Sequence, residues 1–133
     1  MRKIGVFLLF GVLGACVMPT DDMINNDFSA VRAVPAPPGM PGKWTGSNGP
    51  YLMTIFLEQD GTGLSCYGWG NKQSVGRIKF DGGQLRFQDG TRIKLARQGE
   101  KLLGRAPYTS AQDIVFVSDP ELSLADPYCS KNL

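Results

Sequence analysis

The sequence contains no histidine in its 133 residues, and it has only three cysteines. Histidine is the commonest general base in enzymes and the commonest metal ligand, so its absence weighs against both kinds of site. Acidic residues do not replace it, because Asp60, Asp81 and Asp89 each precede a glycine in an expected turn, where an aspartate has a structural role. We therefore expect no enzymatic activity, no metal ion and no cofactor.

The sequence also lacks an apolar run long enough to cross a membrane as a helix. The apolar residues 4–13 are soon followed by Asp21 and Asp22, whereas a spanning helix needs about 18 apolar residues or more. Arg2 and Lys3 precede the run and small residues follow it. Positive charge, a short apolar run and small residues, in that order, are the layout of an export signal.

The residue after the small pair is a cysteine, so that residues 13–16 read Leu-Gly-Ala-Cys. This motif resembles the lipobox of bacterial lipoproteins; the alternative is an ordinary secretory signal with an incidental cysteine. The resemblance implies that residues 1–15 are a lipoprotein signal peptide and that Cys16 carries the lipid that anchors the protein to a membrane. In the sorting rule known for enteric lipoproteins, Asp after the lipidated cysteine retains the protein in the inner membrane. Val17 therefore implies sorting to the outer membrane. We expect the anchored protein to face the periplasm.

The chain has little net charge. Its 14 basic and 12 acidic side chains give +2, and removal of Arg2 and Lys3 with the signal leaves 12 of each sign. Net charge therefore gives no support for nucleic-acid binding, and an exported protein is in the wrong compartment for it. We expect no nucleic-acid partner.

The remainder of the chain divides into a tether and a folded body. Residues 16–42 hold five of the nine prolines together with Asp21, Asp22, Asn25, Asn26 and Asp27, a composition that favours a flexible, Pro-rich tether behind the lipidated cysteine. Residues 43–133 hold most of the 17 glycines and several runs of alternating apolar and polar residues. We expect this second part to be the only folded domain.

Alternating runs predict an all-β body. Residues 51–58 and 62–69 flank an Asp-Gly turn, and three shorter runs follow between further Gly-containing turns. The inward residues of the short runs are expected to be Ile78 and Phe80, Leu85 and Phe87, and Ile93 and Leu95. The pattern predicts a small antiparallel meander of about eight strands that forms a closed or nearly closed β-barrel, filled by side chains. Residues 120–125 are expected to form one helical turn.

Cys66 and Cys129 remain after Cys16 is assigned to the lipid. In an exported protein such a pair favours a disulfide. Two free buried thiols and a metal site are the alternatives, and two cysteines without histidine make a poor zinc site.

A row of basic side chains is expected to face solvent. It consists of Arg77, Lys79, Arg86, Arg92 and Lys94, which we call the basic stripe. A solvated face is the ordinary explanation of such charges. The alternative is a binding surface for an anionic envelope component, such as lipopolysaccharide phosphates or anionic lipid, or for an acidic protein partner.

Gly42-Lys43-Trp44 ahead of a meander resembles the Gly-x-Trp opening of the lipocalins. The resemblance implies a barrel whose closed end is plugged by Trp44, with Arg105 lying across it. A lipocalin-like carrier of small apolar ligands would have an apolar cavity beside Trp44. Residues 104–108, with Thr109 and Ser110, are loosely similar to the loop that lipid-anchored lysozyme inhibitors insert into lysozyme.

These observations predict a lipid-anchored envelope lipoprotein that acts as a non-catalytic binding or structural module. A small apolar-ligand carrier and a lysozyme inhibitor are the alternatives. The three differ in where the active surface lies: on the basic stripe, inside the barrel, or on the loop at residues 105–110.

Overall fold

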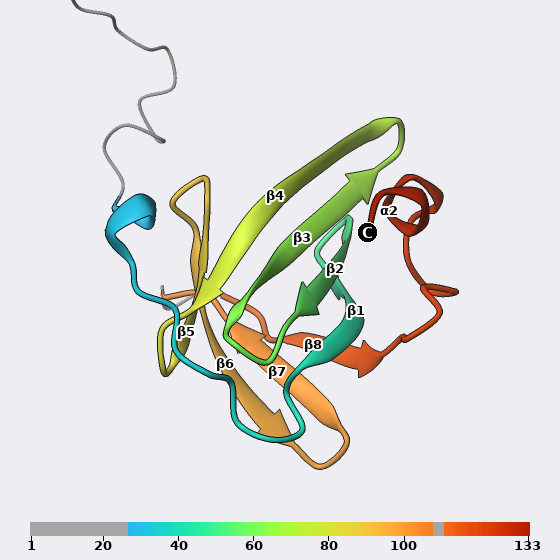
Figure 1. Cartoon of the computed structure of the whole chain (residues 1–133). Helices are drawn as coiled ribbons and strands as arrows, with labels where there is room; N and C mark the ends of the chain where they lie inside the picture. Colours follow the sequence, from blue (N-terminus) through green and yellow to red (C-terminus); the bar gives the residue numbers. More distant parts are fainter. Residues whose placement is uncertain (1–26, 108–110) are drawn as a thin grey trace, which may run out of the picture.

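The computed structural model describes residues 27–107 and 111–133. Eight antiparallel strands form a closed barrel (Figure 1), as the sequence predicts. The strands are β1 (Gly42–Asn48), β2 (Tyr51–Leu57), β3 (Thr62–Trp69), β4 (Lys72–Phe80), β5 (Gln84–Phe87), β6 (Arg92–Gln98), β7 (Lys101–Arg105) and β8 (Ile114–Ser118). A short 3-10 helix, η1 (Phe28–Ala30), precedes the barrel, and helix α2 (Pro127–Asn132) follows it.

The barrel is a simple meander, because each strand pairs with the next one along the chain. It closes where β1 pairs with β8, with Trp44 opposite Ser118 and Thr45 opposite Val117. Closure pairs the two end strands with each other, so neither is left as a free edge along this contact.

The barrel interior is filled by side chains, as expected. The six inward residues predicted for the short strands β4, β5 and β6 are all buried. They belong to one apolar cluster whose members are Met40, Trp44, Met53, Ile55, Leu57, Ile78, Phe80, Leu85, Phe87, Ile93, Leu95, Leu102, Ile114 and Phe116. Burial of this set supplies the main driving force for folding.

The prediction of a flexible tether as far as residue 42 is wrong for residues 27–41, which lie along the barrel. Val34 N donates to Phe80 O at 2.9 Å, Ala36 N donates to the backbone oxygen of Gln59 at 3.1 Å, and Met40 is only 6% exposed. The fit is close at Gly61, where a Cβ atom would lie 2.0 Å from the carbonyl oxygen of Val34. Composition alone could not show that these backbone groups and apolar side chains find partners on the barrel. Residues 1–26, which include the predicted signal and Cys16, lie outside the described residues.

The helical turn expected at residues 120–125 is also wrong, because the C-terminal helix begins later, at Pro127. The carboxylate of Asp126 accepts a hydrogen bond from Tyr128 N and so caps the helix. Upstream, the carboxylate of Asp119 accepts from the backbone N–H groups of Ser123 and Leu124. These bonds satisfy donors that a helix would otherwise use.

Within the described part of the chain, no helix has the length and apolarity needed to cross a membrane.

Candidate functional site

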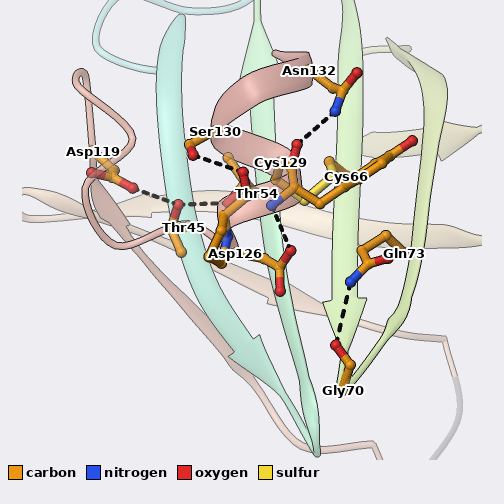
Figure 2. Close-up of a disulfide and its surroundings, with 12 residues drawn as sticks. Thr45, Thr54, Cys66, Gly70, Gln73, Asp119, Asp126, Cys129, Ser130 and Asn132 are labelled. Carbon is orange, nitrogen blue, oxygen red and sulfur yellow. Dashed lines mark hydrogen bonds between the residues drawn. A yellow bond between two sulfur atoms is a disulfide. The ribbon is translucent and has the colours of Figure 1, made fainter.

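The disulfide predicted from the cysteine count is present. It joins Cys66 in β3 to Cys129 in α2, with their Cα atoms 5.7 Å apart (Figure 2). Both residues are completely buried. The bond holds α2 against the outside of the barrel, where a Cβ atom on Gly68 would lie 2.6 Å from the carboxyl carbon of Asp126.

The strand register brings most of the basic stripe together on the outside of β4, β5 and β6. Lys79 lies opposite Arg86, and Arg86 lies opposite Arg92. Arg77 lies two residues before Lys79 on β4, and Lys94 lies two residues after Arg92 on β6. Like charges directly opposite one another are destabilising, so this row requires either counter-charges or another compensating interaction.

Two of the five cations are used within the fold. The Lys79 ammonium donates to the carbonyl oxygens of Phe28 and Val31, at 2.9 and 3.0 Å, and lies 4.5 Å from the centroid of the Phe28 ring. Arg86 pairs with Asp27 at 2.6 Å and with Asp81 at 3.2 Å. Lys79 and Arg86 therefore hold the N-terminal segment on the barrel.

The remaining cations of the basic stripe, Arg77, Arg92 and Lys94, are exposed. None of the three takes part in an ion pair with the residues that the structure describes. A shallow groove of about 400 Å³ lies beside the stripe, and Phe28, Leu64, Arg77 and Lys79 are among its lining residues. An anionic ligand on this face would meet three charges that are not already neutralised.

Asp81 has an environment that favours its ionised form. Burial by itself raises the pKa of the Asp81 carboxyl, but the hydrogen bonds from Gln84 N, Arg86 and Gly83 N together lower it below its ordinary value. The Gln84 N–H donates at 2.9 Å. This carboxylate therefore stays charged well into the acid range and keeps its pairing with Arg86.

Trp44 is buried at the end of the barrel that the N-terminal segment crosses. Its side chain is 5% exposed, and its indole Nε1 donates to the carbonyl oxygen of Met40 at 2.9 Å. Arg105 does not lie across Trp44, so that expectation is corrected. Arg105 is 62% exposed and pairs with Asp113 at 2.7 Å, because the alternation of β7 directs it outward while Leu102 and Gly104 are buried.

A hollow that sequence reasoning missed lies at the other end of the barrel. It has a volume of about 240 Å³. It is lined by Asn48, Tyr51, Met53, Tyr67, Phe87, Asp89 and Thr91, and we call it the mouth hollow. Trp44 is not among its lining residues, although the carrier hypothesis expected a cavity beside that tryptophan.

Aromatic rings gather at the rim of the mouth hollow. The ring centroid of Tyr51 lies 5.6 Å from that of Tyr67 and 5.3 Å from that of Trp69, both in edge-to-face geometry. Such pairs stabilise an arrangement beyond the area that they bury. The sequence signal was the period-two alternation, which places Tyr51 with Met53, and Tyr67 with Trp69, on the inner face of their strands.

The turn aspartates have the structural roles expected of them. Asp60 accepts from the N–H and hydroxyl of Thr62, which lowers the pKa of its carboxyl, and Asp89 accepts from Thr91 N at 2.9 Å. Among the described residues, no three histidine, cysteine or acidic side chains are grouped so that they could hold a metal ion. The loop that resembles lysozyme inhibitors includes residues 108–110, which lie outside the described residues.

The family described as "bacterial lipocalin LPS transport optimiser YedD" matches residues 25–133. The chain belongs to this family. A search among curated proteins finds no match by sequence.

Two solved structures share the fold of this YedD-family chain. The lipoprotein YedD from Klebsiella pneumoniae subsp. pneumoniae MGH 78578 has a TM-score of 0.59 and 16% identity, over 79% of this chain and 90% of that one. A protein from Streptococcus pneumoniae, described as a candidate lipoprotein, has a TM-score of 0.54 and 17% identity, over 65% of this chain and 99% of that one. These comparisons support the resemblances to lipoproteins and lipocalins. Lipidation of Cys16 stays a prediction.

Proposed function

We propose that this protein is a lipid-anchored lipoprotein of the bacterial outer membrane, facing the periplasm, that assists lipopolysaccharide transport without catalysing a reaction. The observation that carries the proposal is the family match over residues 25–133, whose description names lipopolysaccharide transport. The closed, filled barrel is consistent with a binding or structural module. The Leu-Gly-Ala-Cys motif at residues 13–16 supplies the predicted anchor.

In the part of the barrel that the structure describes, the interior offers little space for the lipid part of lipopolysaccharide. Pockets for small molecules usually have about 300–1,000 Å³, whereas the mouth hollow has about 240 Å³. The rest of the interior is occupied by the apolar cluster. The protein therefore acts through its outer surface rather than by enclosing a lipid.

The exposed part of the basic stripe is the surface best suited to an anionic envelope component. Arg77, Arg92 and Lys94 present three charges on adjoining strands, and clustered charges of one sign attract ligands of the opposite sign. Phosphate groups of lipopolysaccharide have this chemistry, as does an acidic protein surface. Lys79 and Arg86 contribute to the field of the face while they hold the N-terminal segment.

The test is complementation of a strain that lacks this protein. The readout is the rate at which newly labelled lipopolysaccharide reaches the cell surface, together with sensitivity to a large antibiotic that an intact outer membrane excludes. We expect the native chain to restore delivery and Cys16→Ala to fail, since it has no lipid. A normal delivery rate in the deletion strain would show that the proposed function is wrong.

A charge-reversal variant tests the surface separately. Arg77→Glu, Arg92→Glu and Lys94→Glu together should fold, because all three side chains are exposed, yet should restore delivery poorly. The matched control reverses the exposed cations Arg32, Lys101 and Lys131, which lie off the stripe. Equal complementation by the two triple variants would exclude the stripe as the binding surface.

A small apolar-ligand carrier is the second candidate, and the mouth hollow favours it. The hollow combines Met53, Phe87 and two tyrosines with the polar groups of Asn48, Asp89 and Thr91, a mixture typical of ligand pockets. Native mass spectrometry of the protein extracted from membranes should then show a bound small molecule. Phe87→Trp should displace that molecule by filling the hollow.

A further inference from the structure

Among the residues that the structure describes, the first half of β4 has a neighbouring strand on one side only. β4 pairs with β3 along residues 72–79, but it pairs with β5 only from Ile78 to Phe80. Residues 72–76, which we call the β4 edge, therefore lack a second neighbouring strand within ranges 27–107 and 111–133. In Figure 1 the β3–β4 hairpin projects beyond the neighbouring β5.

Gln88 explains why β5 stops there. Its backbone N–H donates to Arg77 O at 3.0 Å, while its side-chain oxygen accepts from Arg77 N at 3.1 Å. The side chain thus takes the place of a strand carbonyl as the backbone leaves the sheet. Gly90 N then donates to Phe87 O, and Phe87 N donates to Thr91 O, which turns the chain back into β6.

The open backbone groups of the β4 edge can be assigned from this geometry. The N–H and C=O of one strand residue point to the same side, and the side alternates along an antiparallel strand. Because Arg77 directs both groups towards β5, Val75 and Gln73 direct theirs the same way, while Ser74 and Gly76 bond to β3. No described residue bonds to the outward N–H and C=O groups of Val75 and Gln73.

A second hollow adjoins the β4 edge. It has a volume of about 160 Å³, and a cavity of about 150 Å³ accommodates a benzene-sized ring. Gly76 leaves the space open because it has no side chain, and Tyr67 and Phe87 supply apolar walls. Val75, which is among the lining residues and is 38% exposed, adds further apolar surface.

Charge at the two ends of the edge favours an acidic occupant. Lys72 begins β4 and Arg77 follows the edge, and both side chains are exposed. Neither forms an ion pair within the described ranges 27–107 and 111–133. Asp89, on the opposite wall, already accepts a hydrogen bond from Thr91 N.

We propose that the β4 edge binds an extended segment of a partner protein, which pairs with Val75 and Gln73 as a ninth strand. An apolar side chain of that segment enters the adjoining hollow, and acidic side chains face Lys72 and Arg77. Strand addition of this kind obtains affinity from backbone hydrogen bonds and specificity from pockets for alternate side chains. The inference rests on the proposed function only in treating the protein as a docking module.

The first test uses the full chain in detergent and a synthetic peptide, Glu-Val-Thr-Phe-Thr-Val-Glu. Amide hydrogen exchange is followed by NMR. Saturating peptide should slow exchange at Gln73 and Val75, with no comparable change in the β1–β2 hairpin. A peptide with lysine in place of both glutamates should bind about tenfold more weakly.

Two variants separate backbone pairing from side-chain effects. Val75→Pro removes the N–H that points away from β3, so the barrel keeps its own pairing while the edge is blocked. Val75→Thr keeps the N–H and a β-branched side chain. We expect the proline variant to bind the acidic peptide about tenfold more weakly than the threonine variant.

Three results would overturn the proposal. The first is equal affinity of the proline and threonine variants. The second is unchanged exchange at Gln73 and Val75 with saturating peptide. The third is sedimentation of the native chain as a dimer that Val75→Pro dissociates, because the occupant is then a second copy. If Val75→Pro fails to fold, Lys72→Glu with Arg77→Glu replaces it and should reverse the preference between the two peptides.

The peptide assay contains no lipopolysaccharide, so its outcome is independent of the delivery assay. Normal delivery in the deletion strain would reject the proposed function and leave strand addition standing. Absence of peptide binding, with defective delivery in that strain, would reject strand addition alone.

Discussion

The hydroxyl of Thr45 donates a 2.8 Å hydrogen bond to the carboxylate of Asp119, and both residues are buried. Thr45 Oγ1 also lies 2.7 Å from Thr54 Oγ1 (Figure 2). Because the only hydroxyl hydrogen of Thr45 is used towards Asp119, Thr54 must be the donor in the second bond. The chain from Thr54 through Thr45 to Asp119 ties the outer faces of β1 and β2 to the C-terminal segment.

Replacing Asp119 tests this network. Asp119→Ala leaves the Thr45 hydroxyl and the N–H groups of Ser123 and Leu124 without an acceptor, so we expect the free energy of unfolding to fall by about 3 kcal/mol. Asp119→Asn keeps one acceptor oxygen, so it should lower the free energy of unfolding by less. Urea unfolding measures both, and an alanine variant as stable as the asparagine variant would contradict the assigned role.

Trp44 closes one end of the barrel by packing and by one hydrogen bond, and two variants separate these contributions. Trp44→Phe retains most of the packing but leaves the carbonyl oxygen of Met40 without the indole donor, at a cost of about 1 kcal/mol. Trp44→Ala also leaves a cavity and should cost about 3–5 kcal/mol. Thermal unfolding distinguishes the two. Similar losses for both variants would mean that packing contributes little.

The disulfide closes a loop over a sequence separation of 63 residues. In the chain-entropy model a loop of this length stabilises the fold by about 4 kcal/mol. Replacing Cys66 and Cys129 by alanine together should therefore lower the unfolding midpoint strongly. Reductant should lower the midpoint of the native chain and leave that of the double variant unchanged; a reductant effect on both would point to another cause.

Lys79 should control the release of the N-terminal segment. Lys79→Met removes the two bonds to the carbonyl oxygens of Phe28 and Val31, so trypsin should cut after the exposed Arg32 faster than in the native chain. The barrel itself should lose little stability. Lys94→Met is the matched control, since Lys94 lies on the same face and forms no ion pair with the described residues of the segment. Equal cleavage of the two variants would show that Lys79 does not hold it.

Acid should weaken the attachment of Arg86. The pKa of Asp81 is lowered in the folded protein by the bonds from Gln84, Arg86 and Gly83 that outweigh burial, whereas an unfolded aspartate titrates near about 3.9. Stability from Asp81 is therefore present above that pH and is lost as the pH falls through the lower folded value. In urea unfolding from pH 7 to pH 2, Asp81→Asn should be less stable than the native chain at neutral pH and should converge with it in acid. A difference in the free energy of unfolding that stays constant across this pH range would rule out Asp81 as the source of the acid sensitivity.

The sequence by itself determined the barrel and the disulfide that joins Cys66 to Cys129. Alternation in the short runs around Ile78, Leu85 and Ile93 identified the buried face, because side chains in a strand alternate between its two sides. The disulfide followed from having two cysteines left once Cys16 was assigned to the lipid. Both inferences depend on features that a sequence displays directly: the alternation of apolar and polar residues, and the number of cysteines left to pair.

Only the tertiary structure decided which charges are free and which strand is open. Lys79 bonds to Phe28 across 51 residues and Arg86 pairs with Asp27 across 59. The sequence of the basic stripe alone, or of the tether alone, therefore could not show that the two bind each other. The β4 edge likewise depends on the chain leaving the sheet directly after Gln88, which is hydrogen-bonded to Arg77. Such contacts join residues distant in the sequence, and their partners are set by the register of the closed barrel rather than by any local pattern.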